Sequence, residues 1–177
     1  MTRFVRRAAV LAALVAAPVL AVAGPAFAAE SGHATGTKPV AVDKVAVDKV
    51  AYENQVVALT NVQRKAHGCG ALRNDSRLAQ SARAHSTDMV KQGFFSHTGS
   101  SGSSFVAREI SAGYPKKGPS AENIAWGFRT PQDVVTGWMN SPGHRANILN
   151  CGSVAVGVGL AYTSGGSAYW TQDFGRI

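Results

Sequence analysis

Two histidines and one glutamate stand out because their side chains can bind a metal ion or transfer a proton. His97 follows a Phe-Phe-Ser sequence, Glu122 begins Glu-Asn-Ile-Ala, and His144 follows Ser-Pro-Gly. Neutral imidazoles and a carboxylate are zinc ligands, and three protein ligands leave a fourth position for water. Alternatively, Glu122 holds the second nitrogen of one imidazole and fixes its tautomer without touching the metal. The sequence leaves both arrangements open.

The same residues also fit a hydrogen-bond network that contains no metal. Histidines and glutamates at helix starts and strand ends tie neighbouring segments together, and Asn123, Arg145 and Asn147 would join such a network. In either case we expect Asn123, Asn147 and Ser141 to form the shell around the three central side chains.

Helices must position most of these residues. Between Trp138 and Asn150 the sequence predicts one helix that ends at Ser-Pro-Gly and a second that starts at once, with His144 in its first turn. A helix is predicted over residues 52–67, with the apolar residues Tyr52, Val56, Leu59 and Val62 at helical spacing.

A further helix is predicted after the Asn-Asp-Ser cap at residues 74–76, with His85 on its apolar face and its end at Gly93. Residues 105–112 indicate a short helical turn, and residues 122–127 a short strand. Thr130-Pro131 opens the helix that leads to Ser-Pro-Gly. The segments 154–162 and 168–174, joined by a Gly-Gly turn, predict an antiparallel hairpin. Helices that precede a hairpin favour an α+β domain.

The 177 residues indicate one domain with extensions, because a single core usually serves about 100–200 residues. Residues 1–28 have a basic start, an apolar run and an Ala-Phe-Ala cleavage site, which is typical of a secretory signal peptide. Residues 29–51 contain Val-Ala-Val-Asp-Lys twice and predict a flexible tether. The domain is then expected over residues 52–177, and no later segment is long and apolar enough to span a membrane.

Charge gives only a weak indication of partners. Without the three arginines of the signal segment, 15 basic residues face 10 acidic ones, or about +5 with neutral histidines. Such a charge favours anionic wall polymers or lipid head groups, and it also serves simply to solvate a surface. No basic run alternates with aromatic residues, which argues against nucleic acid. We expect a secreted monomer whose partner is an extracellular lipid, cell-wall polymer or protein.

Cys69 and Cys151 are the two cysteines of the chain, and an even pair in an exported protein usually forms a disulfide. In the chain-entropy model a loop of this size stabilises the fold by roughly 4–5 kcal/mol. The bridge would tie the end of the first helix to the loop after the His144 helix.

Four ordered blocks carry a family resemblance: Phe-Phe-Ser-His, Ala-Glu-Asn-Ile-Ala, Pro-Gly-His-Arg-Ala-Asn-Ile-Leu and Tyr-Trp-Thr-Gln-Asp-Phe-Gly. In this order and spacing they resemble the CAP superfamily, also called SCP/TAPS, which includes cysteine-rich secretory proteins, antigen 5 and pathogenesis-related 1 proteins. The match is strongest to the bacterial secreted branch and covers about residues 52–176. The resemblance implies an α-β-α sandwich with a small antiparallel central sheet covered by helices, and a large cleft.

The resemblance also implies a His-Glu-Glu-His tetrad in that cleft, whose histidines bind a divalent metal in several members. His97, Glu122 and His144 match three of its positions. The second glutamate would fall at Ser141, and Ala155 replaces a glutamate that many bacterial members carry. Zinc or another divalent cation is the cofactor that this resemblance implies.

We interpret the chain as a secreted, non-enzymatic binding or interaction module with a metal-capable cleft. Two alternatives stay open: a metal-dependent hydrolase of peptides or cell-wall material that uses His97, Glu122 and His144, and an extracellular lipid- or sterol-binding protein. The sequence has no His-Glu-x-x-His motif, no inverse of it and no Gly-x-Ser-x-Gly motif. A Ser-His-Glu hydrolase built on Ser96 or Ser141 would need a nucleophile that nothing nearby in the sequence activates.

Aromatic residues near these motifs could provide a wall that stacks on sugars, although their spacing is more typical of a core. They are Phe94, Phe95, Trp126, Trp138, Tyr169 and Trp170.

Overall fold

The computed structural model describes residues 48–177. The predicted signal peptide and all but the last residues of the predicted tether therefore lie outside the described residues. The elements follow one another as α1 (Lys49–Ala66), β1 (Arg73–Asn74), α2 (Ser76–Gln92), α3 (Phe105–Ser111), β2 (Pro119–Trp126), α4 (Pro131–Asn140), α5 (Pro142–Ile148), β3 (Ala155–Tyr162) and β4 (Ala168–Gly175).

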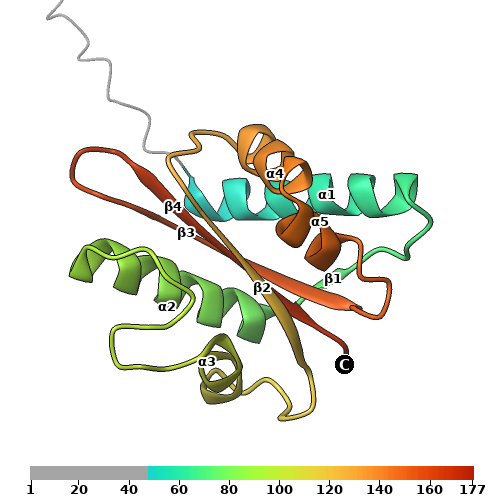
Figure 1. Cartoon of the computed structure of the whole chain (residues 1–177), viewed down its shortest axis with the longest axis horizontal. Coiled ribbons are helices and arrows are strands. Elements are labelled where there is room, and N and C mark those ends of the chain that lie inside the picture. Colours follow the sequence, from blue (N-terminus) through green and yellow to red (C-terminus); the bar gives the residue numbers. More distant parts are fainter. Residues whose placement is uncertain (1–47) are drawn as a thin grey trace, which may run out of the picture. The chain divides into compact units, whose positions relative to one another are not determined.

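The strands form one sheet in the order β1-β3-β4-β2. Strand β4 pairs antiparallel with both β2 and β3, and β1 adds a two-residue parallel pair with β3 that we did not predict. Figure 1 shows α2 and α3 on one side of the sheet and α1, α4 and α5 on the other. The predicted α+β class and α-β-α sandwich are therefore confirmed.

Helix α1 begins three residues earlier than predicted, because the Asp48 side chain caps it by accepting from the backbone N–H groups of Val50 and Ala51. Its first turn thus takes up the last residues of the predicted tether. Val56 is completely buried, as the helical spacing indicates, but Val62 is 61% exposed. The charged Arg64 lies in the interior instead, so the apolar stripe predicted through Val62 is wrong at its end.

Helix α2 has both of its predicted ends. The Asp75 side chain accepts from the backbone N–H of Arg77 at 3.0 Å, and Gly93 closes the helix with a positive φ of 67°. The face predicted to point inward does so, and His85 on it is completely buried. Its Nε2 donates to the backbone oxygen of Ser96 at 2.9 Å, which makes it a satisfied core histidine at that nitrogen.

Helix α2 lies directly on the backbone of β3. A Cβ at Gly157 would fall 2.0 Å from the backbone nitrogen of Ala79, and one at Gly159 would fall 2.2 Å from the carbonyl carbon of Ala82. Side chains at these two strand positions would therefore push the helix away from the sheet.

The main core lies between the sheet and the α1, α4 and α5 layer. Trp138 and Trp170 fill its centre, and each indole N–H reaches a backbone oxygen, of Ile124 at 3.2 Å and of Phe128 at 2.9 Å. For these two aromatic residues the core interpretation is confirmed.

The predicted disulfide is present, and the Cα atoms of Cys69 and Cys151 are 5.0 Å apart. The same loop is held by Arg64, whose guanidinium donates to four backbone oxygens. These belong to Gly70, Ile148, Asn150 and Ser153, at 2.7–2.9 Å. Burial lowers the pKa of Arg64.

None of the helices between residues 48 and 177 combines the length and the apolar character that crossing a membrane requires.

Candidate functional site

His97 and Glu122 form the centre of the candidate site. His97 lies in the segment that follows the Gly93 end of α2, and Glu122 lies in the middle of the edge strand β2. Nδ1 of His97 is 2.7 Å from Oε1 of Glu122, whose side chain is only 1% exposed, whereas the imidazole is 54% exposed. With Nδ1–H donating to the carboxylate, Nε2 keeps its lone pair for a ligand on the open side.

Arg108 on α3 fixes this pair from behind, and no feature of the sequence singled it out. One guanidinium nitrogen is 2.5 Å from Oε2 of Glu122, and another donates to the backbone oxygens of His97 and Ser103 at 3.0 and 2.9 Å. Both oxygens of Glu122 are thus engaged. Arg108 therefore positions His97 in two ways: it binds the backbone oxygen of His97, and it holds the Glu122 carboxylate to which His97 bonds.

His144 reaches the site from the opposite layer. Pro142 and Gly143 start α5 immediately after α4, which places His144 in the first turn as predicted. Its side chain is half-buried, and its pKa is lowered by burial first and by the nearby His97 second. The two imidazoles thus lie near enough for His97 to influence the charge of His144, and Glu122 lies behind His97.

Of the three residues predicted to surround the site, Asn123 and Asn147 bond to it and Ser141 does not. Asn147 donates to Oδ1 of Asn123 at 2.8 Å and to the backbone oxygen of Glu122 at 3.3 Å. Asn123 in turn donates to the backbone oxygen of His144 at 3.2 Å. These amides lock α5 onto β2, and so they set the position of His144 relative to Glu122.

Ser141 lies at the joint between α4 and α5, where its backbone oxygen accepts from the N–H of Arg145 and its side chain caps neither helix. Ala155, the other position without the implied glutamate, is completely buried in β3 beside Leu78 and Tyr114. Neither residue brings a carboxylate to the histidines.

The donors suit a metal site of two imidazoles. Because Glu122 binds His97 and Arg108, it would stand behind a metal ligand, as in the second of the two arrangements that the sequence left open, and would not be a ligand itself. Among residues 48–177, no three histidine, cysteine, aspartate or glutamate side chains are grouped so that they could hold a metal ion by themselves. His97 and His144 would be the protein ligands, and water or an external ligand would complete the coordination.

Two further acids near this site were missed. Asp173 on β4 lies directly opposite Glu122 in the strand pairing, and Glu109 follows Arg108 on α3. Both are completely buried. A polar residue in a strand that helices cover on both faces was the available signal for Asp173, since such positions are usually apolar.

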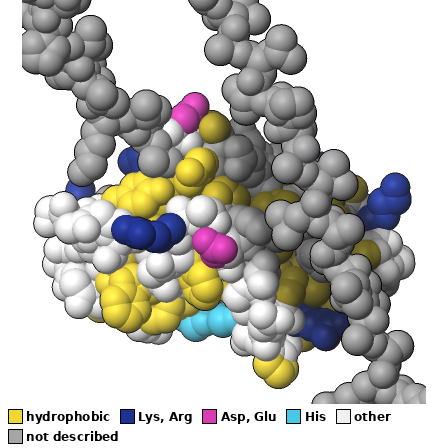
Figure 2. Space-filling model, turned by 90° about the horizontal axis from the view of Figure 1, so that it is seen from above, with side chains coloured by type: hydrophobic (Ala, Val, Ile, Leu, Met, Phe, Trp, Pro, Cys, Tyr) yellow, Lys and Arg dark blue, Asp and Glu magenta, His cyan; other side chains and the backbone are white. Residues whose placement is uncertain are grey.

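Two of the predicted aromatic residues reach the surface. Phe95 is 49% and Trp126 is 57% exposed, and their ring centroids lie 6.2 and 6.3 Å from that of Tyr169. Figure 2 shows hydrophobic side chains gathered in patches on one face of the molecule, with a histidine at the lower edge. Aromatic surface next to the histidine segment is thus available to a ligand.

Known proteins resemble this chain over most of the described residues. The uncharacterized protein YkwD of Bacillus subtilis is 45% identical over 125 residues, which are 70% of this chain and 46% of that protein. The uncharacterized membrane protein YlbC of the same organism is 34% identical over 137 residues, which are 77% of this chain and 38% of that protein. The chain thus spans less than half the length of either relative.

Solved structures of other proteins show the same fold. An extracellular protein containing an SCP domain from Bacillus anthracis is 30% identical with a TM-score of 0.67, covering 80% of this chain and 45% of that one. An outer surface protein from Borrelia burgdorferi, 21% identical, shares the fold with a TM-score of 0.66 and covers 73% of this chain and 96% of that one. The sequence profile of the cysteine-rich secretory protein family, CAP, matches residues 57–174. With this match and the His97–Glu122 and His144 geometry in place, the chain belongs to the CAP family of cysteine-rich secretory proteins.

Proposed function

We propose that this chain is a secreted binding module whose cleft lies at the β2 edge of the sheet. There His97 and His144 hold a divalent metal ion, zinc in the first instance, and a group from an extracellular partner completes its coordination. The observation that carries this proposal is the 2.7 Å bond from Nδ1 of His97 to Glu122, which leaves Nε2 of a half-exposed imidazole free for a ligand in the neighbourhood of His144.

Binding fits this arrangement better than hydrolysis does. The Ser96 hydroxyl accepts from the backbone N–H of Thr98, and within residues 48–177 neither it nor the Ser141 hydroxyl bonds to an imidazole. An activated serine would need such a bond. Glu122, the nearest carboxylate, is held by Arg108 and cannot also act as a free general base.

A location outside the cell agrees with the relatives' names and with the predicted signal peptide. One similar structure is described as an extracellular protein and another as an outer surface protein. In such a place a two-histidine site would meet carboxylate, phosphate or imidazole groups of lipids, wall polymers or proteins, each of which can complete a zinc site.

Calorimetric zinc titration of the chain without its predicted signal peptide tests the proposal. We expect one zinc ion per chain with micromolar or tighter affinity, and loss of binding in His97→Ala and in His144→Ala. Glu122→Gln keeps the side-chain size and is expected to weaken binding about 10–100-fold, as removal of such supporting carboxylates typically does.

His67→Ala is the matched control, since His67 is exposed at the end of α1 and its ring contacts Gln63 and Arg145 rather than Glu122. Folding of each variant is checked by far-UV circular dichroism. A folded parent that binds no zinc, or binding that survives in both His97→Ala and His144→Ala, would overturn the proposal and leave the three residues as a structural network.

A further inference from the structure

The open edge of the sheet offers backbone hydrogen-bond donors that the described part of the chain does not use. Strand β2 is the outer strand beside β4. At its end the N–H of Gly127 donates to the oxygen of Ala168. In an antiparallel pair, such hydrogen-bonded positions alternate with positions whose N–H and C=O groups point away from the partner strand. Glu122, Ile124 and Trp126 occupy these alternate positions, so their backbone groups point outward.

Side-chain contacts at this edge confirm the outward direction. The oxygen of Glu122 accepts from the Asn147 amide at 3.3 Å. The oxygen of Ile124 accepts from the indole N–H of Trp138 at 3.2 Å. The N–H groups of Glu122, Ile124 and Trp126, however, find no acceptor among residues 48–177. A backbone N–H without a protein acceptor bonds to water or to a ligand, so the edge has three donors in a row for an external partner.

The edge is reached from outside at both of its ends. Glu122 is 5% exposed as a whole residue while its side chain is 1% exposed, so the surface that it exposes belongs mainly to its main chain. Trp126 is 57% exposed. Figure 1 shows β2 running between α3 and α5. Glu122 faces His97 on one side and Asn123 faces α5 on the other, which places the edge between the two histidine-bearing segments.

The spacing of the three donors indicates the class of partner. Residues of one strand that point the same way are about 7 Å apart. An extended polypeptide presents its carbonyl oxygens at the same spacing, which is how a strand is added to a sheet edge. β2 is eight residues long, has no lysine, and has its one proline at the first position, Pro119. It therefore lacks features that usually protect an edge from such pairing.

An aromatic cluster at the end of this edge offers a place for a partner side chain. The ring centroids of Phe95 and Trp126 lie 6.2 and 6.3 Å from that of Tyr169. Exposed aromatic residues often provide much of the energy of an interface. Trp126 follows Glu122 by four residues, and alternate residues of a strand share a face. A partner strand would thus place one side chain on the rings and another, four residues away, beside His97.

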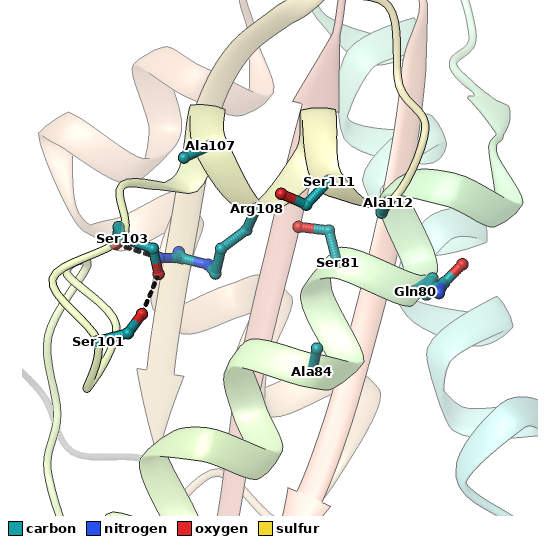
Figure 3. Close-up of a pocket in the computed structure, with 9 residues that line it drawn as sticks. All are labelled: Gln80, Ser81, Ala84, Ser101, Ser103, Ala107, Arg108, Ser111 and Ala112. Carbon is teal, nitrogen blue, oxygen red and sulfur yellow. Dashed lines mark hydrogen bonds between the residues drawn. The ribbon is translucent and has the colours of Figure 1, made fainter.

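The cavity between α2 and α3 has none of these features. Its volume is about 370 Å³, and Figure 3 shows the hydroxyls of Ser81 and Ser111 pointing into it from the two helices. The lining consists of four serines, three alanines, Gln80 and Arg108, with neither a strand edge nor an aromatic ring. An extended partner therefore fits the edge of β2 and not this cavity.

We propose that an extended segment of a partner polypeptide binds along the open edge of β2 as an added strand. Its carbonyl oxygens accept from the N–H groups of Glu122, Ile124 and Trp126. One of its apolar side chains packs on the rings of Phe95, Trp126 and Tyr169. This names the partner class of the binding module and rests on the proposed function in placing the ligand in the same cleft. The backbone donors need no metal ion, so peptide and zinc binding are tested apart.

The test uses the chain without its predicted signal peptide, in buffer that contains EDTA so that zinc is excluded. The probes are the acetylated and amidated octapeptide Thr-Thr-Trp-Thr-Val-Thr-Glu-Thr and the same residues in reverse order, because a strand edge pairs in either direction. Tryptophan and glutamate are separated in both peptides as Trp126 and Glu122 are in β2. We expect calorimetry to show one of the two peptides bound, one per chain.

N-methylated forms of the bound peptide test whether it pairs as a strand. One form is methylated at the backbone nitrogens of residues two, four and six, and the other at those of residues three, five and seven. Only one of these sets faces the edge. That form should bind at least about tenfold more weakly, and the other should bind like the unmethylated peptide. This comparison uses the parent chain, so it does not depend on the folding of a variant.

Variants at Trp126 separate the ring from the backbone donor. Trp126→Ala removes the ring and should weaken peptide binding about tenfold. Trp126→Pro also removes the outward N–H, which the pairing with β4 does not use, and should weaken binding about threefold further. Val62→Ala is the matched control, because Val62 is 61% exposed on α1, and it should bind like the parent. Far-UV circular dichroism checks that each variant is folded.

The proposal is overturned if the folded parent binds neither peptide, or if both methylated forms bind as tightly as the unmethylated peptide. Binding of cellotetraose in place of the peptides would assign the aromatic cluster to a glycan and would also overturn it. Peptide binding by a parent that binds no zinc would support the added strand and overturn only the metal site. Zinc binding without peptide binding would do the reverse.

Discussion

Glu122 and Asp173 lie directly opposite each other in the pairing of β2 with β4, so two acids occupy one cross-strand position. The two carboxylates have different surroundings. Glu122 accepts from Arg108 and His97, whereas no donor reaches Asp173 within hydrogen-bonding geometry in the described residues, and burial together with Glu122 raises the pKa of Asp173. Glu122 can therefore hold Arg108 and the His97 imidazole, whereas Asp173 favours its protonated form.

Removal of the Glu122 carboxylate is expected to destabilise the domain more than removal of the histidine it holds. Glu122→Ala leaves Arg108, whose side chain is 11% exposed, without its carboxylate, and should lower the free energy of unfolding by about 3 kcal/mol. His97→Ala removes a half-exposed partner and should lower it by less than about 1 kcal/mol. Urea denaturation measures both, and equal losses would contradict the role given to Arg108.

Stability is expected to fall as pH rises, because Glu109 keeps its proton in the folded domain. In the unfolded chain its carboxyl ionises from about pH 4.5, whereas in the folded domain it ionises only near pH 9, so the unfolded state gains stability between these values. Asp173 acts in the same direction.

Glu109→Gln removes the contribution of Glu109 to this loss of stability with rising pH. In EDTA-containing buffer at about pH 8, the variant should be more stable than the parent by about 2–4 kcal/mol, with little difference near pH 4. Urea denaturation at both pH values measures the effect, and Asp133→Asn serves as the exposed control. A parent whose unfolding free energy does not change between these pH values would contradict the prediction.

Arg64 is expected to be one of the most sensitive positions of the fold. Arg64→Met leaves four backbone oxygens without their donor and should lower the free energy of unfolding by about 3 kcal/mol. Lysine cannot reproduce the planar fork, so Arg64→Lys should also destabilise, by about 2 kcal/mol. The neighbouring Lys65 is exposed, and Lys65→Met should change stability by less than about 0.5 kcal/mol.

The Cys69–Cys151 bridge should appear in non-reducing mass analysis as a loss of two hydrogens relative to the free-thiol chain. Its reduction should lower the free energy of unfolding by no more than about 4–5 kcal/mol, the value for a loop of this size in the chain-entropy model. Since Arg64 holds the same loop, the reduced domain should stay folded at room temperature and show an unchanged far-UV circular dichroism spectrum. Two free thiols in the purified chain would contradict the bridge.

Local signals in the sequence predicted the elements that carry the histidines. Asp75 and Gly93 mark the ends of α2 through side-chain and backbone geometry that acts over a few residues, and the Ser-Pro-Gly break places His144. Such signals depend on neighbours in the chain, which a sequence displays directly.

Contacts between distant segments could not be predicted in the same way. The buried Arg64 donates to backbone oxygens that lie 6–89 residues away in the chain, and no pattern of side chains in the sequence predicts these hydrogen bonds. Arg108 meets Glu122 only through the packing of α3 on β2. The short β1, two residues long, also depends on its neighbour β3 rather than on a pattern of its own.

The glycines of β3 also limit how the molecule can move. Because Gly157 and Gly159 let the backbones of α2 and β3 touch, neither element can tilt or slide without a clash, and the two should respond to a ligand as one rigid body. Because Arg108 holds the main chain of His97 and the Asn123 and Asn147 amides hold α5, a ligand would meet both histidines already in position.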